Sequence, residues 1–220
     1  MTQIQPMPSG TTPRPIRDAR VNAVIASLHA AQRYPSDGGP RSHPGRDPAE
    51  YAEHGFSIFP DQGDLIYLLC RGLRAKRVVE FATSVGMSTL YFAAAMRDNG
   101  GGVVIGSELV PAKVATARRN LAEAGLADYA EIREGDARET LRDLGGFVDF
   151  ALIDGWPLGS GPSLARQVIE LVAPQLRVGG YVMNDNAEPD FLDYIRDPAN
   201  GFLSVTLPLK GGTELSVKVA

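Results

Sequence analysis

The sequence predicts an α/β fold, in which a doubly wound, mostly parallel sheet of seven strands ends in an antiparallel hairpin. Short apolar runs alternate with segments of helical periodicity from residue 60 onward. Five strands joined by helices require right-handed crossovers, so they form a parallel sheet with helices on both faces. Only the short Pro-Leu-Lys-Gly-Gly connection at 208–212 separates the last two runs, which favours a hairpin at the sheet edge.

The start of the chain has a different composition. Eight of the 16 prolines fall in the first 50 residues, where no Phe or Trp occurs. Such a stretch cannot pack a core of its own, so we expect residues 1–50 to be an appendage of a main domain at 51–220. One amphipathic helix is expected over Ile16 to Arg33, covering the active site or a partner subunit, and a flexible loop over Tyr34 to Glu50.

The main domain is expected to begin with a helix over Gln62 to Leu73, capped by Asp61 because its carboxylate can accept from the free amides of the first turn. The later elements follow from the same alternation of patterns. They are strand Arg77–Ala82, helix Ser88–Arg97, strand Val103–Glu108, helix Pro111–Ala124, strand Tyr129–Glu134, helix Ala137–Leu144, strand Val148–Asp154, helix Pro162–Ala173, strand Gly180–Asp185, helix Pro189–Arg196 and the hairpin Phe202–Leu207 with Glu214–Val219.

Charge and composition exclude several classes of function. The net charge of −4 offers no excess of Lys and Arg to neutralise the phosphates of a nucleic acid. Apolar runs such as Leu65 to Cys70 are far shorter than the roughly 20 residues that span a bilayer. One cysteine cannot form an internal disulfide, and the N-terminus lacks the pattern of a signal peptide. We therefore expect a cytoplasmic protein that binds neither nucleic acid nor membrane.

Polar residues after the first two strands indicate a nucleoside site, because ligands of such sheets bind at the carboxyl ends of the strands. Gly86 allows close approach of a backbone, while Ser84 and Ser88 offer hydroxyls at the start of a helix. Glu108 ends the second strand and can accept hydrogen bonds from ribose hydroxyls. The Gly-x-Gly-x-x-Gly turn of dinucleotide enzymes is absent, which favours a smaller ligand such as S-adenosylmethionine over a nicotinamide dinucleotide.

Two acids and an amide follow the fourth and fifth strands, at the same edge of the predicted sheet. Asp154 ends one strand, and Asp185 with Asn186 ends its neighbour, so the three side chains should share a cleft. Two close carboxylates raise each other's pKa unless a cation lies between them. An all-oxygen set suits Mg²⁺ or a similar divalent ion.

These motifs resemble those of class I S-adenosylmethionine-dependent methyltransferases, and more closely the catechol and caffeoyl-CoA O-methyltransferases. The likeness covers Pro60 to Val219 and is carried by 79–89, by Glu108 with 120–126, and by 134–137. It implies a Rossmann-like methyltransferase fold, with the 79–89 segment facing the methionine part of the cofactor and Glu108 on the ribose. The cofactor-binding residues that it implies are Glu80, Ala82, Ser84, Gly86, Ser88, Glu108, Asp136, Ala137, Asp154 and Trp156, with Trp156 on the adenine edge; Asp154, Asp185 and Asn186 match the metal ligands.

The chain departs from the catechol enzymes at the general base. Their lysine directly after the tryptophan is Pro157 here, and the glutamate that binds the second catechol hydroxyl has no counterpart. Ala82 replaces the first glycine of the cofactor motif. His54 is a candidate base because histidine titrates near neutral pH, although a metal ion alone can acidify the acceptor.

The sequence therefore favours a metal-assisted, S-adenosylmethionine-dependent O-methyltransferase that acts on a small hydroxylated molecule, aromatic or chelating. Asp154 and His54 are its catalytic candidates, and its N-terminal helix is a lid or the contact of a homodimer. The alternatives are a nicotinamide-dependent oxidoreductase and a metal-independent protein of methyltransferase type, the latter suggested by Pro157.

Overall fold

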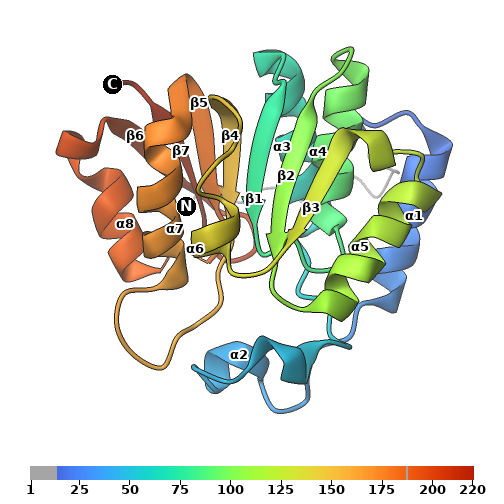
Figure 1. The fold of residues 1–220 in the computed structure, drawn as a ribbon, viewed down its shortest axis with the longest axis horizontal. Coiled ribbons are helices and arrows are strands. Elements are labelled where there is room, and N and C mark those ends of the chain that lie inside the picture. Colours follow the sequence, from blue (N-terminus) through green and yellow to red (C-terminus); the bar gives the residue numbers. More distant parts are fainter. Residues whose placement is uncertain (1–13, 187) are drawn as a thin grey trace, which may run out of the picture.

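A seven-stranded sheet in the order β3-β2-β1-β4-β5-β7-β6 forms the centre of the fold (Figure 1). The structure is a computed structural model that describes residues 14–186 and 188–220. Strands β1 to β5 pair in parallel, whereas β7 is antiparallel to both β5 and β6. The predicted fold class is confirmed. The strands are β1 Arg77–Phe81, β2 Val103–Glu108, β3 Ala130–Glu134, β4 Val148–Ile153, β5 Leu176–Asn184, β6 Phe202–Leu207 and β7 Thr213–Lys218.

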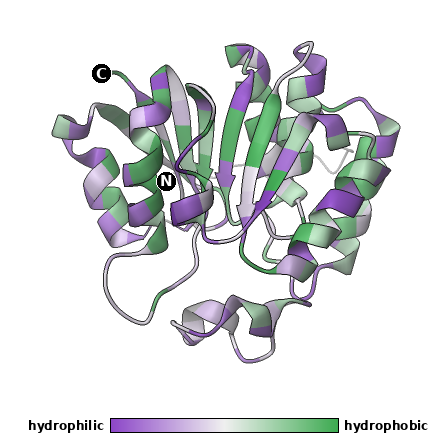
Figure 2. Ribbon diagram, in the orientation of Figure 1, coloured by the Kyte–Doolittle hydropathy of each residue, from purple (hydrophilic) through white to green (hydrophobic). Residues whose placement is uncertain are grey.

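Helices cover both faces of the sheet and enclose two apolar cores. Val78 and Val79 show the division, because successive side chains of a strand point to opposite faces: the first packs with α1, α3, α4 and α5, and the second with α6, α7 and α8. In Figure 2 the middle strands are largely green, as expected for strands buried on both faces. The helices are α1 Ala19–Ala31, α2 Gly39–Ser42, α3 Pro60–Leu73, α4 Met87–Asp98, α5 Pro111–Glu123, α6 Ala137–Thr140, α7 Leu164–Val172 and α8 Pro189–Arg196, with 3₁₀ turns at Pro48–Tyr51, Ala127–Tyr129, Ala173–Gln175 and Pro198–Asn200.

Helix α1 belongs to the core of the domain. Asp18 caps it by accepting from the amides of Arg20 and Val21, and Val21 and Ile25 are buried in the same cluster as α4 and α5. The predicted helix exists, but its buried side chains pack beside α4 and α5, so the expectation that it covers the site is wrong. The expected contact with a partner subunit stays a prediction. The division of the chain at residue 50 stays a prediction. Residues 1–13 of the expected appendage lie outside the described part of the chain.

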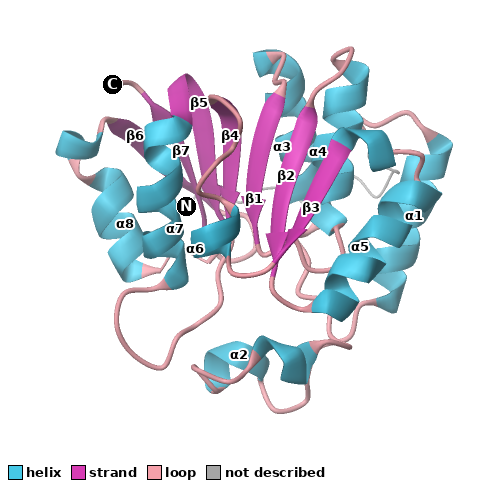
Figure 3. Ribbon diagram, viewed as in Figure 1, coloured by secondary structure: helices cyan, strands magenta, loops and turns pink. Residues whose placement is uncertain are grey.

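The segment from Tyr34 to Tyr51, which we call the roof segment, lies beyond the carboxyl ends of the strands (Figure 3). The sequence predicted a flexible loop through Glu50, whereas the structure has the short helix α2 and a 3₁₀ turn there. Asp47 caps that turn by accepting from the amide of Ala49 over 2.9 Å. The roof segment, rather than α1, therefore covers the edge of the sheet where ligands of this architecture bind.

Two other expectations needed correction. Helix α3 begins at Pro60, with Phe59 as its N-cap, and the side chain of Gln62 accepts from the Phe59 amide. Asp61 is therefore in the first turn and not at the cap position, although its carboxylate accepts from the Gln62 amide over 2.9 Å as expected. Helix α6 ends at Thr140 and not at Leu144 as predicted. The guanidinium of Arg133 donates to the carbonyls of Thr140 and Asp143, beyond the end of the helix. The remaining element boundaries differ from the predictions by a few residues, mostly at frayed ends.

No helix in the described ranges is long and apolar enough to cross a membrane.

Candidate active site

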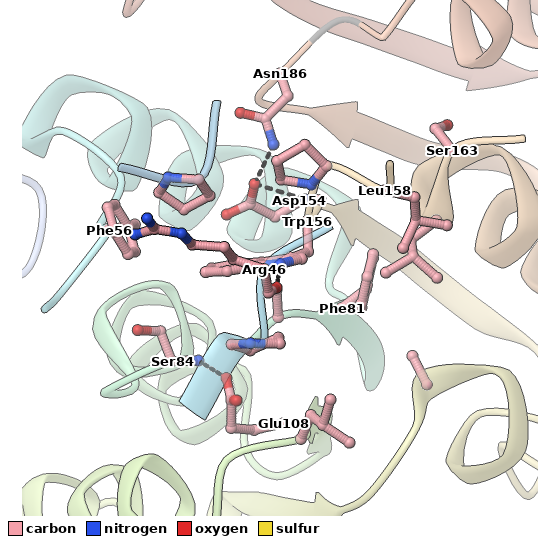
Figure 4. A pocket seen from close by; sticks show the side chains of 18 of the residues that line it. Arg46, Phe56, Phe81, Ser84, Glu108, Asp154, Trp156, Leu158, Ser163 and Asn186 are labelled. Carbon is pink, nitrogen blue, oxygen red and sulfur yellow. Dashed lines mark hydrogen bonds between the residues drawn. The ribbon is translucent and has the colours of Figure 1, made fainter. Parts of the chain in front are cut away.

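A cavity of about 980 Å³ opens between the roof segment and the carboxyl ends of β1, β2 and β4 (Figure 4). This volume lies at the upper end of the range for small-molecule sites, so it can hold a nucleoside together with a second ligand. The structure brings most of the predicted site residues to this one place. Those that line the cavity are Ala82, Ser84, Glu108, Asp136, Ala137, Asp154, Trp156 and Asn186. Those that do not are His54, Glu80, Gly86, Ser88 and Asp185.

The loop between β1 and α4 turns sharply beneath the cavity. Ala82 and Ser84 have φ angles of 67° and 53°, in the left-handed region that L-residues seldom adopt. Hydrogen bonds hold the turn: the amides of Ala82 and Thr83 both donate to the carbonyl of Ser107 over 3.1 Å. The backbone, rather than the side chains, therefore shapes this end of the cavity.

Glu108 is fixed by the same loop. One of its carboxylate oxygens accepts from the Ser84 amide over 2.7 Å, and the other accepts from the Val110 amide over 2.8 Å. The side chain is only 7% exposed, yet it lines the cavity (Figure 4). Each oxygen keeps a further lone pair, so a rigidly held acceptor of two hydrogen bonds faces the ligand space.

Glu80 and Ser88 lie beneath the loop and not in the cavity. Glu80 is fully buried and accepts from the hydroxyls of Ser88, over 2.8 Å, and Thr89. Burial raises the pKa of the Glu80 carboxyl, against the opposing effect of these hydroxyl donors. The two residues expected to contact the cofactor instead connect β1 to the first turn of α4.

Gly86 also serves packing. Its φ of 86° favours glycine, and a Cβ there would lie 3.2 Å from the Cβ of Ala117 on α5. The glycine is needed for the close approach of α5. The expected approach of a ligand to its backbone stays a prediction.

Asp136 and Ala137 line the far side of the cavity, after β3. Asp136 caps α6 by accepting from the Arg138 amide over 2.8 Å, and it forms a 2.5 Å ion pair with the Arg138 guanidinium. Hydrogen bonding from Arg138 lowers the pKa of Asp136. The carboxylate is thus ionised at neutral pH, and the start of α6 lies beside the ligand space.

Trp156 connects the cavity to the roof segment. Its indole Nε1 donates to the carbonyl of Arg46 over 3.0 Å, and the Gly45 amide donates to the carbonyl of Pro157 over the same distance. The indole ring also meets Tyr51 and Phe56 edge-on, at centroid separations of 5.5 and 6.1 Å. Its contacts are therefore with the roof segment and with Phe56, which follows that segment, and the expected adenine contact stays a prediction.

His54 is not brought to the acids at the strand ends. Its ring stacks on Phe56 and meets Tyr51 edge-on, with centroids 6.5 and 5.9 Å away, and it does not line the cavity. Its buried Nδ1 has no hydrogen-bond partner in the described part of the chain. This placement removes the geometric basis for His54 as the base.

The acids after β4 and β5 lie close together, as the topology predicted. Asp154 accepts from the Gly155 amide over 2.7 Å and from the Asn186 amide nitrogen over 2.5 Å (Figure 4). Burial and then the negative charge of Asp185 raise the pKa of Asp154 to about 7, against the opposing charge of Lys210. Asp185 is 2% exposed and accepts from the side chains of Gln62 and Lys210.

The donors of this cluster suit a hard cation, since they are two carboxylates and an amide. The ammonium of Lys210 already pairs with Asp185, which shows that a positive charge is accommodated here. In residues 14–186 and 188–220, no three His, Cys, Asp or Glu side chains are grouped so that they could hold a metal ion. Any ion at this site would depend on Asn186, on water or on a ligand to complete its coordination.

Sequence reasoning missed two lysines that line the cavity. Lys210 lies in the β6–β7 turn and meets Asp185 from 25 positions away, a contact that local pattern does not reveal. Lys113 is 4% exposed and shares one face of α5 with Val114 and Ala117. A lysine within the apolar stripe of an amphipathic helix was the available signal for it.

Residues 79–187 match the family described as methyltransferase domain. Among curated proteins, catechol O-methyltransferase from Niastella koreensis is 30% identical over 153 residues, or 63% of this chain and 66% of that protein. Catechol O-methyltransferase from Mycobacterium tuberculosis is 30% identical over 145 residues, or 61% of this chain and 63% of that protein. The chain thus spans slightly less than two thirds of each relative.

A solved structure agrees in fold. The O-methyltransferase from Bacillus cereus in complex with S-adenosylhomocysteine superposes with a TM-score of 0.63 at 19% identity, covering 92% of both chains. The resemblance predicted from the sequence motifs is confirmed by these matches.

Proposed function

We propose that this chain, whose residues 79–187 match the family described as methyltransferase domain, is an S-adenosylmethionine-dependent O-methyltransferase acting on a small hydroxylated molecule. One observation carries the proposal: Glu108, clamped by two backbone amides, lines a cavity of about 980 Å³ at the carboxyl ends of parallel strands. A fixed carboxylate in that place suits the two hydroxyls of a ribose. The catechol O-methyltransferases that the chain resembles support the reaction class.

The cofactor would extend along three strand ends. We assign the ribose to Glu108, the adenine to the start of α6 at Asp136 and Ala137, and the amino-acid half to the loop at Ala82 and Ser84. All five residues line the cavity, which supports this placement. The acceptor would lie on the remaining side, where Phe56, Trp156 and Leu158 form an apolar wall suited to an aromatic ring.

Methyl transfer from a sulfonium is an in-line displacement, so holding the acceptor oxygen close to the methyl carbon supplies much of the acceleration. We assign Asp154, Asp185 and Asn186 to a divalent ion such as Mg²⁺, which when bound lowers the pKa of a hydroxyl that coordinates it. The roof segment excludes water from this step. Asp154, which lines the cavity, is the carboxylate in position to contact an acceptor hydroxyl.

A metal-independent enzyme is the second candidate, favoured by the ion pair between Lys210 and Asp185. In that case the lysine supplies the positive charge that the divalent ion would supply. Transfer of a labelled methyl group from S-adenosylmethionine to a panel of catechols, with Mg²⁺ or with a chelator, separates the two. Activity that survives chelation selects the second candidate.

Calorimetric titration tests the cofactor directly. We expect S-adenosylhomocysteine to bind and NADH not to bind. Glu108→Gln should weaken S-adenosylhomocysteine binding by roughly 1–3 kcal/mol, the scale of hydrogen bonds to a charged group. Glu131→Gln, an exposed residue on β3, is the matched control and should bind normally. Binding of NADH instead, or unchanged affinity in Glu108→Gln, contradicts the assignment.

A further inference from the structure

Lys113 is a buried lysine without an oxygen partner. It is 4% exposed and lines the cavity, and its ammonium lies 5.4 Å from the centroid of the Phe56 ring. No oxygen of the described residues lies within hydrogen-bond or ion-pair distance of its Nζ. The other lysines differ: Lys76 and Lys218 each donate to two backbone carbonyls, and Lys210 pairs with Asp185.

An ammonium in this state is costly, because burial of a charge is compensated only by pairing or hydrogen bonding. Burial lowers the pKa of Lys113, while the carboxylates of Glu108 and Asp154 counteract the shift. Both carboxylates, however, already accept hydrogen bonds from other groups. The ring of Phe56 supplies a cation–π contact, which is weaker than an ion pair in such surroundings. The cavity side of Lys113 is therefore suited to an anionic ligand.

The position of Lys113 on α5 places it beside the loop that follows β1. Lys113 and Ala117 lie one turn apart on the same face of α5, and Ala117 is the residue against which Gly86 packs. The side chain of Asn120, on the same helix, donates to the carbonyl of Val85 over 2.8 Å. The face of α5 that carries Lys113 thus packs on the loop.

Ser84 in that loop, like Lys113, has a polar side-chain atom without a hydrogen-bond partner in the part of the chain that the structure describes. Its hydroxyl oxygen is buried with no partner among the described residues, and the residue lines the cavity. Ser84 and Lys113 therefore both line the cavity, and the polar side-chain atom of each has no hydrogen-bond partner in the described ranges. The backbone amide of Ser84 is bonded to Glu108, so this end directly adjoins the carboxylate assigned to the ribose.

We propose that Lys113 and Ser84 bind the carboxylate of the amino-acid half of S-adenosylmethionine, an inference that rests on the proposed function. The carboxylate is the one anionic group of that cofactor. A single molecule with its ribose at Glu108 places its amino-acid half near Ser84. Lys113 is then a binding residue that the motifs of the sequence did not indicate.

The test compares two ligands that differ only in this group. S-adenosylhomocysteine and its decarboxylated analogue, S-adenosyl-3-thiopropylamine, are titrated calorimetrically into the full chain. The wild type should prefer S-adenosylhomocysteine by about ten- to a hundredfold, the value of a charged hydrogen-bonded contact. Lys113→Met should lose most of that preference and bind the analogue within a few-fold of wild type. Ser84→Ala should lose a smaller part of it.

Lys76→Met removes an exposed lysine at the opposite end of β1 and should keep the full preference. Equal weakening of both ligands in Lys113→Met overturns the inference, because it shows a role in packing, and so does an unchanged preference. If Lys113→Met shows no cooperative transition in thermal unfolding, Lys113→Gln is used in its place and judged by the same criteria. A wild type that binds neither ligand refutes the proposed function itself, whereas one that binds both equally refutes only the carboxylate subsite. A loss seen only in the KM of a carboxylate-bearing acceptor reassigns Lys113 and overturns the inference.

Discussion

At the scale of single residues, Lys210 supplies the positive charge that offsets the two acids after β4 and β5, Asp154 and Asp185. Its ammonium pairs with Asp185, which is otherwise a buried carboxylate held by Gln62. Lys210→Met should lower thermal stability in the presence of a chelator, because removal of one partner leaves a buried charge uncompensated. The same variant should be stabilised by Mn²⁺ more than wild type is, since an ion that binds the folded state raises its stability.

Thermal unfolding with and without Mn²⁺ measures both effects, and Lys76→Met is the control for loss of a lysine. If Mn²⁺ shifts the melting temperature equally in all three proteins, Lys210 and the ion do not share a site.

Glu80 should give the fold a characteristic dependence on pH. Burial raises the pKa of its carboxyl in the folded state, above the value of about 4.3 expected in the unfolded chain. Between these two values the folded state holds a proton that the unfolded state has lost, so stability should fall as pH rises through that window. Glu80→Gln should flatten this part of the profile, as measured by urea unfolding from pH 4 to 8. A profile with the same slope in the variant would exclude Glu80 as its source.

Residue types at strand ends were predictable, whereas the directions of neighbouring side chains were not. Glu108 and Asp154 could be assigned because a parallel sheet brings its carboxyl ends to one edge. Gly86 and Ser88 stand in the same motif, yet they face α5 and Glu80. A motif does not tell which side of a tight turn faces the ligand, so the cofactor contacts of Gly86 and Ser88 stay predictions.

At the scale of elements, α1 is the part of the fold that composition alone misjudged. Proline-rich surroundings suggested an appendage, but the helix supplies buried side chains to the core shared with α4 and α5. The spacing of its apolar residues predicted that the helix packs against another part of the protein. The tertiary contacts identify that part as α4 and α5. The hairpin β6–β7, by contrast, followed from its short Gly-containing turn alone.

Ile25→Ala should therefore destabilise the whole domain. Ile25 is 2% exposed, and removal of a buried Ile side chain costs about 2–5 kcal/mol. Ile25→Val, which removes one methylene, should cost about 0.5–1.5 kcal/mol. Chemical unfolding of the two variants measures both losses of unfolding free energy. Deletion of residues 1–33 should leave a chain that no longer unfolds cooperatively. A stable, cooperative deletion product would restore the view of α1 as an appendage.

At the scale of the whole molecule, the site is complete only when the roof segment lies against the loop after β4. Trp156 and Gly45 each donate a hydrogen bond that joins them. Trp156→Phe keeps an aromatic ring but removes the donor to the Arg46 carbonyl. We expect trypsin to cut after Arg46 faster in this variant, and S-adenosylhomocysteine to slow the cutting in wild type more than in the variant. Equal cutting rates in the two proteins would show that the roof segment is held by other contacts.

Both acceptors of those bonds are backbone carbonyls, of Arg46 and Pro157. These two bonds therefore do not use the side chains of Arg46 and Pro157, although the Arg46 guanidinium donates to Asp37 and Tyr51 within the roof segment. Because Pro157 also lines the cavity, its substitution should change which ligands fit there while its backbone carbonyl still accepts the bond from Gly45.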